Sequence, residues 1–329
     1  MYSSFNFFNN WHKNKLILNE VFLTIFFISL LLFLLGSGVW VALSMIAVSA
    51  IGMALFTTRP VGDAMATTIW GTSSSWTLTA LPLFVWMGEI LFRTKLSENL
   101  FKGLSPWLSK LPGGLIHVNV VGCALFAAIS GSSAVTVATV GKMSIPELRK
   151  RNYPEKLLLG SLAGSGTLGL LIPPSIILII YGVTVQESIA KLFIAGIIPG
   201  IMLAIFFMLY VIGWSMLNKN SMPKMDETFS FSQKIKQSGQ LIPVIVLIVA
   251  VIGSIYVGIA TATEAASLGV VGALILSLFQ KSLNKETFKL SLLGATKTSC
   301  MIAFILAGSA FLSLAMGFTG LPRTLAIWI

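Results

Sequence analysis

The sequence predicts an all-α polytopic membrane protein with one re-entrant helical hairpin and one broken transmembrane helix. Of its 329 residues, 56% are hydrophobic and only 10% are charged, whereas soluble domains average about 25% charged residues. Several apolar stretches approach the length of about 20 residues that a bilayer-spanning helix needs. Two of these stretches are interrupted near their middle, and the interruptions predict the hairpin and the broken helix.

The uninterrupted stretches predict most of the membrane helices. With the broken one, membrane segments are expected at residues 21–36, 39–57, 78–92, 157–186, 192–217, 241–258, 260–280 and 298–318. No small-residue cleavage site follows the first stretch, so we interpret it as a membrane segment and not as a signal peptide. Residues 95–112 differ, because leucines recur at helical spacing among charged and polar side chains. That pattern is typical of an amphipathic helix on the membrane surface.

Residues 114–141 form the first interrupted stretch. The run is apolar, but Ser130-Gly131-Ser132-Ser133 divides it into halves that are each too short to span a bilayer. Irregular backbone at membrane depth must be buried in protein or line a cavity. We therefore predict a re-entrant hairpin whose tip lies inside the protein.

Residues 157–186 form the second interrupted stretch. Three glycines precede Pro173-Pro174 in this otherwise apolar run. Proline has no backbone N–H and clashes with the preceding helical turn, at a cost of about 3 kcal/mol. Two consecutive prolines therefore predict a membrane helix that is broken near its middle.

The distribution of basic residues predicts the orientation. If residues 114–141 are re-entrant, the cytoplasmic loops are 93–112, 142–156, 218–240 and 281–297. All but five of the 22 Lys and Arg residues lie in these loops, the exceptions being Lys13, Lys15, Arg59, Lys191 and Arg323. This bias satisfies the positive-inside rule, whereas a spanning 114–141 would split the basic loops between the two faces. We expect an inner-membrane protein with a periplasmic N-terminal segment, 1–20, and the net charge of +11 does not indicate a nucleic acid partner.

The topology also predicts internal repeats. An odd number of crossings between residues 21 and 217 would place a second unit, 241–329, in the opposite orientation, with 218–240 as a cytoplasmic linker. Inverted repeats of this kind are typical of secondary transporters. At the same offset as in the first unit, a second hairpin would begin beyond Ile329. We therefore expect a C-terminally incomplete second repeat.

The two interruptions together predict a cation site. Serine hydroxyls at the hairpin tip and carbonyls left unpaired by the prolines supply the oxygen ligands that hard cations prefer. No Asp or Glu occurs between Glu98 and Glu147 or between Glu155 and Glu187. Such a site would bind a coupling cation, with Na⁺ as the expected ion, without carboxylates.

Other polar residues have structural as well as functional interpretations. Glu89 is expected to be solvated near a cytoplasmic helix end, and Glu264 has either a functional or a hydrogen-bonding role. His117 is interpreted as structural, and Lys191 and Arg323 as interfacial side chains. Trp40, Trp70, Trp76 and Trp214 lie near segment ends, as an aromatic belt requires. Two histidines with Cys123 and Cys300 in apolar runs indicate neither a transition-metal site nor a disulfide framework.

Five segments carry a family resemblance. They are ALPLFVWMGEIL (80–91), AAISGSSAVTVATVGKMSIPELRKRNYP (127–154), GSGTLGLLIPPSIILIIYGV (164–183), IAKLFIAGIIPGIML (189–203) and GIATATEAASLGVVGAL (258–274). With these motifs the chain resembles the large membrane subunit of tripartite ATP-independent periplasmic (TRAP) transporters. The resemblance implies an elevator-type inverted-repeat fold and sodium-coupled import of an organic acid. It also implies two partners, a small four-helix membrane subunit and a periplasmic substrate-binding protein, and no enzymatic activity or organic cofactor.

The resemblance also implies which residues form the site. The first sodium site of the family falls on Ser130, Ser132, Gly169, Ile172 and Pro174, with Ile172 acting through its backbone carbonyl. Their neighbours Gly131, Ser133, Pro173 and Ser175 are predicted to lie near the substrate. The second sodium site of the family would lie in the second hairpin, which this chain does not contain.

Three alternatives stand beside this interpretation. One is a stand-alone sodium–anion symporter of the same superfamily, and another is an inactive truncated remnant. A third is an intramembrane serine hydrolase that uses Ser132 or Ser133 with His117, but about 20 Å of helix separates His117 from the tip, which is too far for proton transfer. The sequence does not select among C4-dicarboxylates, sialic acids, other sugar acids and keto acids.

Overall fold

The computed structural model describes residues 22–94, 96–223, 230–239 and 241–319, and all regular secondary structure in these ranges is helical. The all-α class is therefore confirmed for the described residues. The chain divides into two compact units, Met1–Ser75 with Cys300–Ile329, and Trp76–Ser299. The predicted N-terminal segment 1–20 and Arg323 lie outside the described residues.

The first unit contains the N-terminal helices and the end of the last helix. Its elements are Phe22–Gly36, α2 (Val41–Phe56), α3 (Val61–Ser73) and the C-terminal part of α14 (Lys285–Phe318). Phe27 and Val48 are buried against Leu312 and Met316 of α14. Helix α3 has no buried residue, but Val61, Ala64 and Met65 on it pack against the buried cluster of Met53, Phe311 and Ala315.

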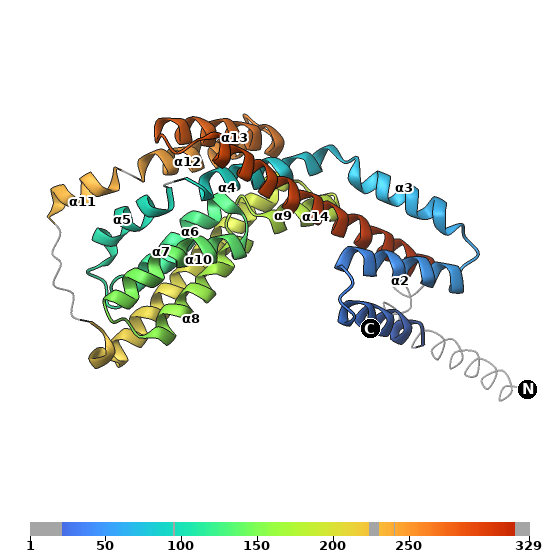
Figure 1. Ribbon diagram of the computed structural model, residues 1–329, viewed down its shortest axis with the longest axis horizontal. Helices are drawn as coiled ribbons and strands as arrows, with labels where there is room; N and C mark the ends of the chain where they lie inside the picture. The colour runs from blue at the N-terminus through green and yellow to red at the C-terminus, as the bar shows by residue number, and fades with distance from the viewer. Residues whose placement is uncertain (1–21, 95, 224–229, 240, 320–329) are drawn as a thin grey trace, which may run out of the picture. The chain divides into compact units, whose positions relative to one another are not determined.

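The second unit contains the remaining helices (Figure 1). They are η1 (Trp76–Thr79), α4 (Ala80–Phe92), α5 (Leu96–Leu108), α6 (Ile116–Ser130), α7 (Ser133–Lys150), α8 (Glu155–Gly166), η2 (Thr167–Leu170), α9 (Ile176–Val185), α10 (Ile189–Leu217), η3 (Lys219–Ser221), α11 (Phe231–Ser238), α12 (Ile242–Tyr256), α13 (Ala262–Phe279) and the start of α14. Helix α6 lies against α7, α8 and α10.

The core of the second unit surrounds the α6–α7 hairpin. Ile116, Phe126, Leu148 and Leu158 are completely or almost completely buried there. Between membrane helices, close packing of such side chains stabilises the contact through van der Waals attraction. The apolar faces of α6, α7 and α8 are thus used for packing against one another, which fixes the position of the hairpin tip.

Helix lengths agree only in part with the predicted membrane segments. Three described helices, α10, α13 and α14, are long and apolar enough to cross a membrane, and up to five spans result if each of two bent helix pairs counts as one. The helices at the predicted segments 21–36 and 39–57 have 15 or 16 residues, so length alone does not mark them as spanning.

Two helices extend beyond the predicted membrane segments. The expected loop 281–297 is helical from Lys285, because α14 extends far beyond the predicted segment 298–318. Asn284 accepts a hydrogen bond from the Thr287 N–H at 2.6 Å, as the residue before a helix does. The second arm of the hairpin also continues past residue 141 to Lys150, and the helix passes through Pro146 without ending there.

Candidate functional site

The hairpin tip is a tight turn centred on Gly131. Helix α6 ends at Ser130, and Gly131 adopts a left-handed conformation with φ of 58°. Its N–H donates to the Ala127 carbonyl at 3.0 Å, and the extended residue Ser132 leads into α7. Glycine is the residue that adopts this conformation without a steric cost, so the Ser-Gly-Ser-Ser sequence reverses the chain within two residues.

The helix break lies between η2 and α9. Pro173 and Pro174, which are joined by a cis peptide bond, have no N–H groups for the carbonyls of Gly169 and Leu170 that a continuous helix would pair with them. The Ser175 hydroxyl donates to the Leu170 carbonyl at 2.8 Å. Backbone acceptors are therefore concentrated at this break.

The tip and the break contact each other directly. The Ile176 N–H, at the start of α9, donates to the Gly131 carbonyl at 3.2 Å. A Cβ atom on Gly131 would lie 2.8 Å from the Pro174 carbonyl oxygen, and one on Gly169 would lie 2.9 Å from the Ser133 backbone nitrogen. The structure thus brings two predicted elements together at positions where only glycine fits.

Four helix ends meet at this contact. The C-terminal ends of α6 and of the α8–η2 segment bring partial negative charge, and the N-terminal ends of α7 and α9 bring partial positive charge. The carbonyl-bearing ends favour a cation, and the N-termini favour an anion. Both kinds of ion can therefore be stabilised at one place without carboxylate or lysine side chains.

The hydroxyl groups at the tip differ in their hydrogen bonding. The Ser130 hydroxyl lies 2.9 Å from that of Thr136 and donates to the Ser132 carbonyl at 3.3 Å. Thr136 is fully buried and is a site residue that the sequence pattern does not indicate, because its contact with Ser130 forms only across the turn. The buried Ser133 oxygen has no hydrogen-bond partner among the described atoms.

The donor set fits an alkali cation. All the candidate ligands are hydroxyl or carbonyl oxygens, which hard cations prefer. Within the described ranges, no group of three or more His, Cys, Asp and Glu side chains could hold a metal ion. Ser130, Ser132, Gly169 and Pro174 lie at the contact, whereas the side chain of Ile172 packs toward Gly200 of α10, which leaves only its backbone for a ligand.

The other predicted polar residues have structural partners. Glu89 is not solvated as expected, because its side chain is 14% exposed and accepts a hydrogen bond from Arg93 at 3.0 Å. Glu264 forms a capping box with Thr261 at the start of α13, which favours its hydrogen-bonding role. His117 is buried with Nε2 at 2.7 Å from the Pro112 carbonyl, in keeping with a structural role.

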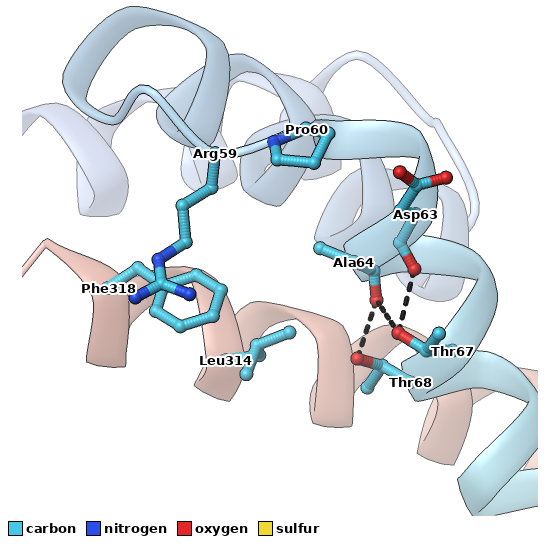
Figure 2. A pocket seen from close by; sticks show the side chains of 8 residues that line it. All are labelled: Arg59, Pro60, Asp63, Ala64, Thr67, Thr68, Leu314 and Phe318. Carbon is cyan, nitrogen blue, oxygen red and sulfur yellow. Dashed lines mark hydrogen bonds between the residues drawn. The ribbon is translucent and has the colours of Figure 1, made fainter.

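A separate pocket of about 390 Å³ lies in the first unit (Figure 2). The guanidinium of Arg59 lies 4.4 Å above the ring centre of Phe318. The hydroxyls of Thr67 and Thr68 each donate to the Ala64 carbonyl, at 3.2 and 2.7 Å (Figure 2). None of the residues that line this pocket belongs to the hairpin tip or to the helix break.

The fold and the site define a multi-pass helical membrane protein in which a hairpin tip meets a broken helix. The chain belongs to the family described as "Tripartite ATP-independent periplasmic transporter, DctM component", whose family model matches residues 27–329. The family expected from the sequence motifs is therefore confirmed.

Curated relatives agree with this membership. The C4-dicarboxylate TRAP transporter large permease proteins DctM of Pseudomonas aeruginosa and Rhodobacter capsulatus are each 32% identical to this chain. The matches cover 80% and 77% of this chain and 62% and 60% of the two relatives. The isethionate TRAP transporter permease protein DctMQ of Oleidesulfovibrio alaskensis is 33% identical over 77% of this chain and 40% of its own length. The chain thus spans about 60% or less of these relatives.

Proposed function

We propose that the chain acts within the large membrane subunit of a TRAP transporter that imports an organic anion together with Na⁺. The observation that carries this proposal is the contact between the hairpin tip and the helix break, where four helix ends meet. The relatives named above are transporter permeases, and their names refer to C4-dicarboxylates and isethionate. All of these compounds are organic anions, and C4-dicarboxylates, sialic acids and other sugar or keto acids remain the candidates for this chain.

Na⁺ binds, in this proposal, at the side of the contact that is rich in acceptors. The hydroxyls of Ser130 and Ser132 and the carbonyls of Gly169, Ile172 and Pro174 are the proposed ligands. Bound Na⁺ would hold the tip against the break, because both elements would ligate one ion. The substrate anion is placed beside Gly131, Ser133, Pro173 and Ser175, where the N-termini of α7 and α9 offset its charge.

The proposal also includes two partner proteins and the orientation of the chain in the membrane. A periplasmic binding protein delivers the anion, and a small four-helix membrane subunit braces the static part of an elevator-type, inverted-repeat fold. The name DctMQ of one relative, of which this chain covers 40%, favours a second membrane component. The N-terminus would face the periplasm and the basic loops the cytoplasm, as the positive-inside rule requires.

Uptake by the complete transporter tests the proposal. Proteoliposomes with the full-length subunit, the small subunit and the binding protein would be supplied with labelled organic acids under an inward Na⁺ or K⁺ gradient. We expect accumulation of at least one organic acid only under the Na⁺ gradient. Equal uptake under both gradients would contradict sodium coupling, and unchanged uptake without the binding protein would favour a stand-alone symporter.

A further inference from the structure

The Trp76–Ser299 unit contains a cavity that is separate from the candidate ion site. Its volume is about 470 Å³, within the range of about 300–1,000 Å³ that small-molecule sites occupy. It lies where the C-terminal end of α4 and the middle of α7 meet the first turns of α14. The lining residues are Phe92, Arg93, Thr94, Thr139, Lys142, Met143, Thr287 and Leu290.

The charges on the wall of this cavity are all positive. Among the described residues that line it, Arg93 and Lys142 are the charged ones. The Thr94 hydroxyl donates to the Leu91 carbonyl at the end of α4, and the Thr139 hydroxyl donates to the Val135 carbonyl within α7, so their hydrogens are already used. A ligand would therefore meet the two cations, which favours an anion.

Arg93 is held in place for such a ligand. Its Nε donates to the Glu89 carboxylate at 3.0 Å, and the two side chains are 27% and 14% exposed. A guanidinium has five N–H donors in a rigid plane, so this bond leaves the four N–H groups of the terminal nitrogens. Carboxylate and phosphate groups match that planar arrangement.

The cavity is connected to the ion site through two helices. Gly88 of α4 packs against the backbone of Ser130, where an added Cβ would lie 3.0 Å from its Cα. Arg93 is five residues further along α4, or about 7.5 Å. On α7, Ser133, Thr136, Thr139 and Lys142 follow at intervals of three residues, and Lys142 is about 14 Å from Ser133 along the axis. A row of polar side chains thus winds from the tip to the cavity.

We propose that this cavity binds an oxyanion, a carboxylate or a phosphate, between Arg93 and Lys142. In the proposed orientation it lies on the cytoplasmic side of the ion site, where an organic anion would leave the protein. Its use as an exit site rests on the proposed function, whereas binding of an oxyanion does not. An acidic phospholipid headgroup presents the same chemistry, so the experiment includes both sources.

Direct binding measurements test this proposal. The purified chain, in phosphatidylcholine nanodiscs and potassium buffer without Na⁺, would be titrated with labelled succinate. In a second arm, the chain would be prepared with phosphatidylglycerol, and the amount of phosphatidylglycerol retained would be measured. We expect saturable binding of one of these probes. Lys142→Gln and Arg93→Gln should each weaken it about tenfold, as expected for loss of a charge-assisted hydrogen bond. Lys150→Gln, an exposed change on the same helix outside the cavity, should leave it unchanged.

A substitution that is expected to strengthen oxyanion binding distinguishes an effect on binding from damage to the fold. Glu89→Gln removes the negative charge beside Arg93, so it should tighten oxyanion binding, whereas damage to the fold would weaken it. Succinate binding that depends on Arg93 and Lys142 identifies a soluble anion, and phosphatidylglycerol retention with the same dependence identifies a headgroup. The proposal is overturned if neither probe distinguishes Lys142→Gln from Lys150→Gln. Because no Na⁺ or transport is involved, failure of the proposed function would not produce that result.

Discussion

Gly131 meets two separate constraints with one hydrogen atom in place of a side chain. Its φ of 58° lies in the left-handed region, which costs other L-residues roughly 1–2 kcal/mol. A Cβ would in addition lie 2.8 Å from the Pro174 carbonyl. Any side chain at this position therefore strains the turn and pushes the tip away from the break.

Gly131→Ala should consequently lower both stability and ion binding. We expect the unfolding free energy to fall by about 1–3 kcal/mol, the usual range for strained glycine positions, and sodium-dependent uptake by the complete subunit to fall severalfold. Thermal unfolding and uptake would measure the two effects. Gly160→Ala is the matched control, since a Cβ at that position would have no atom within 4 Å. A loss of the same size in both variants would refute the close-contact explanation.

Helices α5 and α11 show how distant elements are joined. The Trp107 indole N–H donates to the Ser238 hydroxyl at 2.6 Å, and the Lys234 ammonium lies 5.3 Å from the Trp107 ring centre. Phe231 adds an edge contact at 6.5 Å between ring centres. The Trp107 side chain thus connects α5, the amphipathic helix, to α11.

Trp107→Ala should weaken the packing of α11 against α5 and make α11 more accessible to protease. A cation–π contact is worth about 0.5–1 kcal/mol at an exposed site, and with the hydrogen bond the loss predicts about fivefold or faster tryptic cleavage at Lys234 and Lys236. Limited proteolysis with mass spectrometry would measure the rates. Trp70→Ala, at an exposed tryptophan in the other unit, should have no effect. Unchanged cleavage in Trp107→Ala would show that this contact does not hold α11.

The elements were predictable to the extent that local chemistry determines them. Ser130-Gly131-Ser132-Ser133 and Pro173-Pro174 predict breaks because glycine and proline act on their own backbone. Thr136 could not be selected, since its role depends on the contact with Ser130 across the turn. The cavity between Arg93 and Lys142 joins residues far apart in sequence, and no local pattern indicates it. The start of α14 was missed because its charged residues resemble those of a loop.

The proposed topology of the whole molecule is inferred from the distribution of basic residues. Labelling of accessible cysteines can test it. In a background with the exposed Cys300 replaced by serine, Lys150→Cys should react with a membrane-impermeant thiol reagent only from the cytoplasmic side. Glu187→Cys, which is also exposed, should react only from the periplasmic side. Labelling of both positions from one side would contradict the predicted crossing by residues 157–186, and labelling of Lys150→Cys from the periplasmic side would contradict the re-entrant hairpin.

We propose that the hairpin tip and the helix break bind Na⁺ together. Ligands that bind only the folded state raise its stability in proportion to the logarithm of their concentration. The thermal midpoint of the purified chain should therefore rise when NaCl replaces KCl at equal ionic strength. Ser132→Ala combined with Pro174→Ala removes one hydroxyl ligand and alters the break, so the sodium-specific rise should disappear in that variant. Equal midpoints in NaCl and KCl, or an undiminished sodium-specific rise in the double variant, would contradict joint Na⁺ binding by the tip and the break.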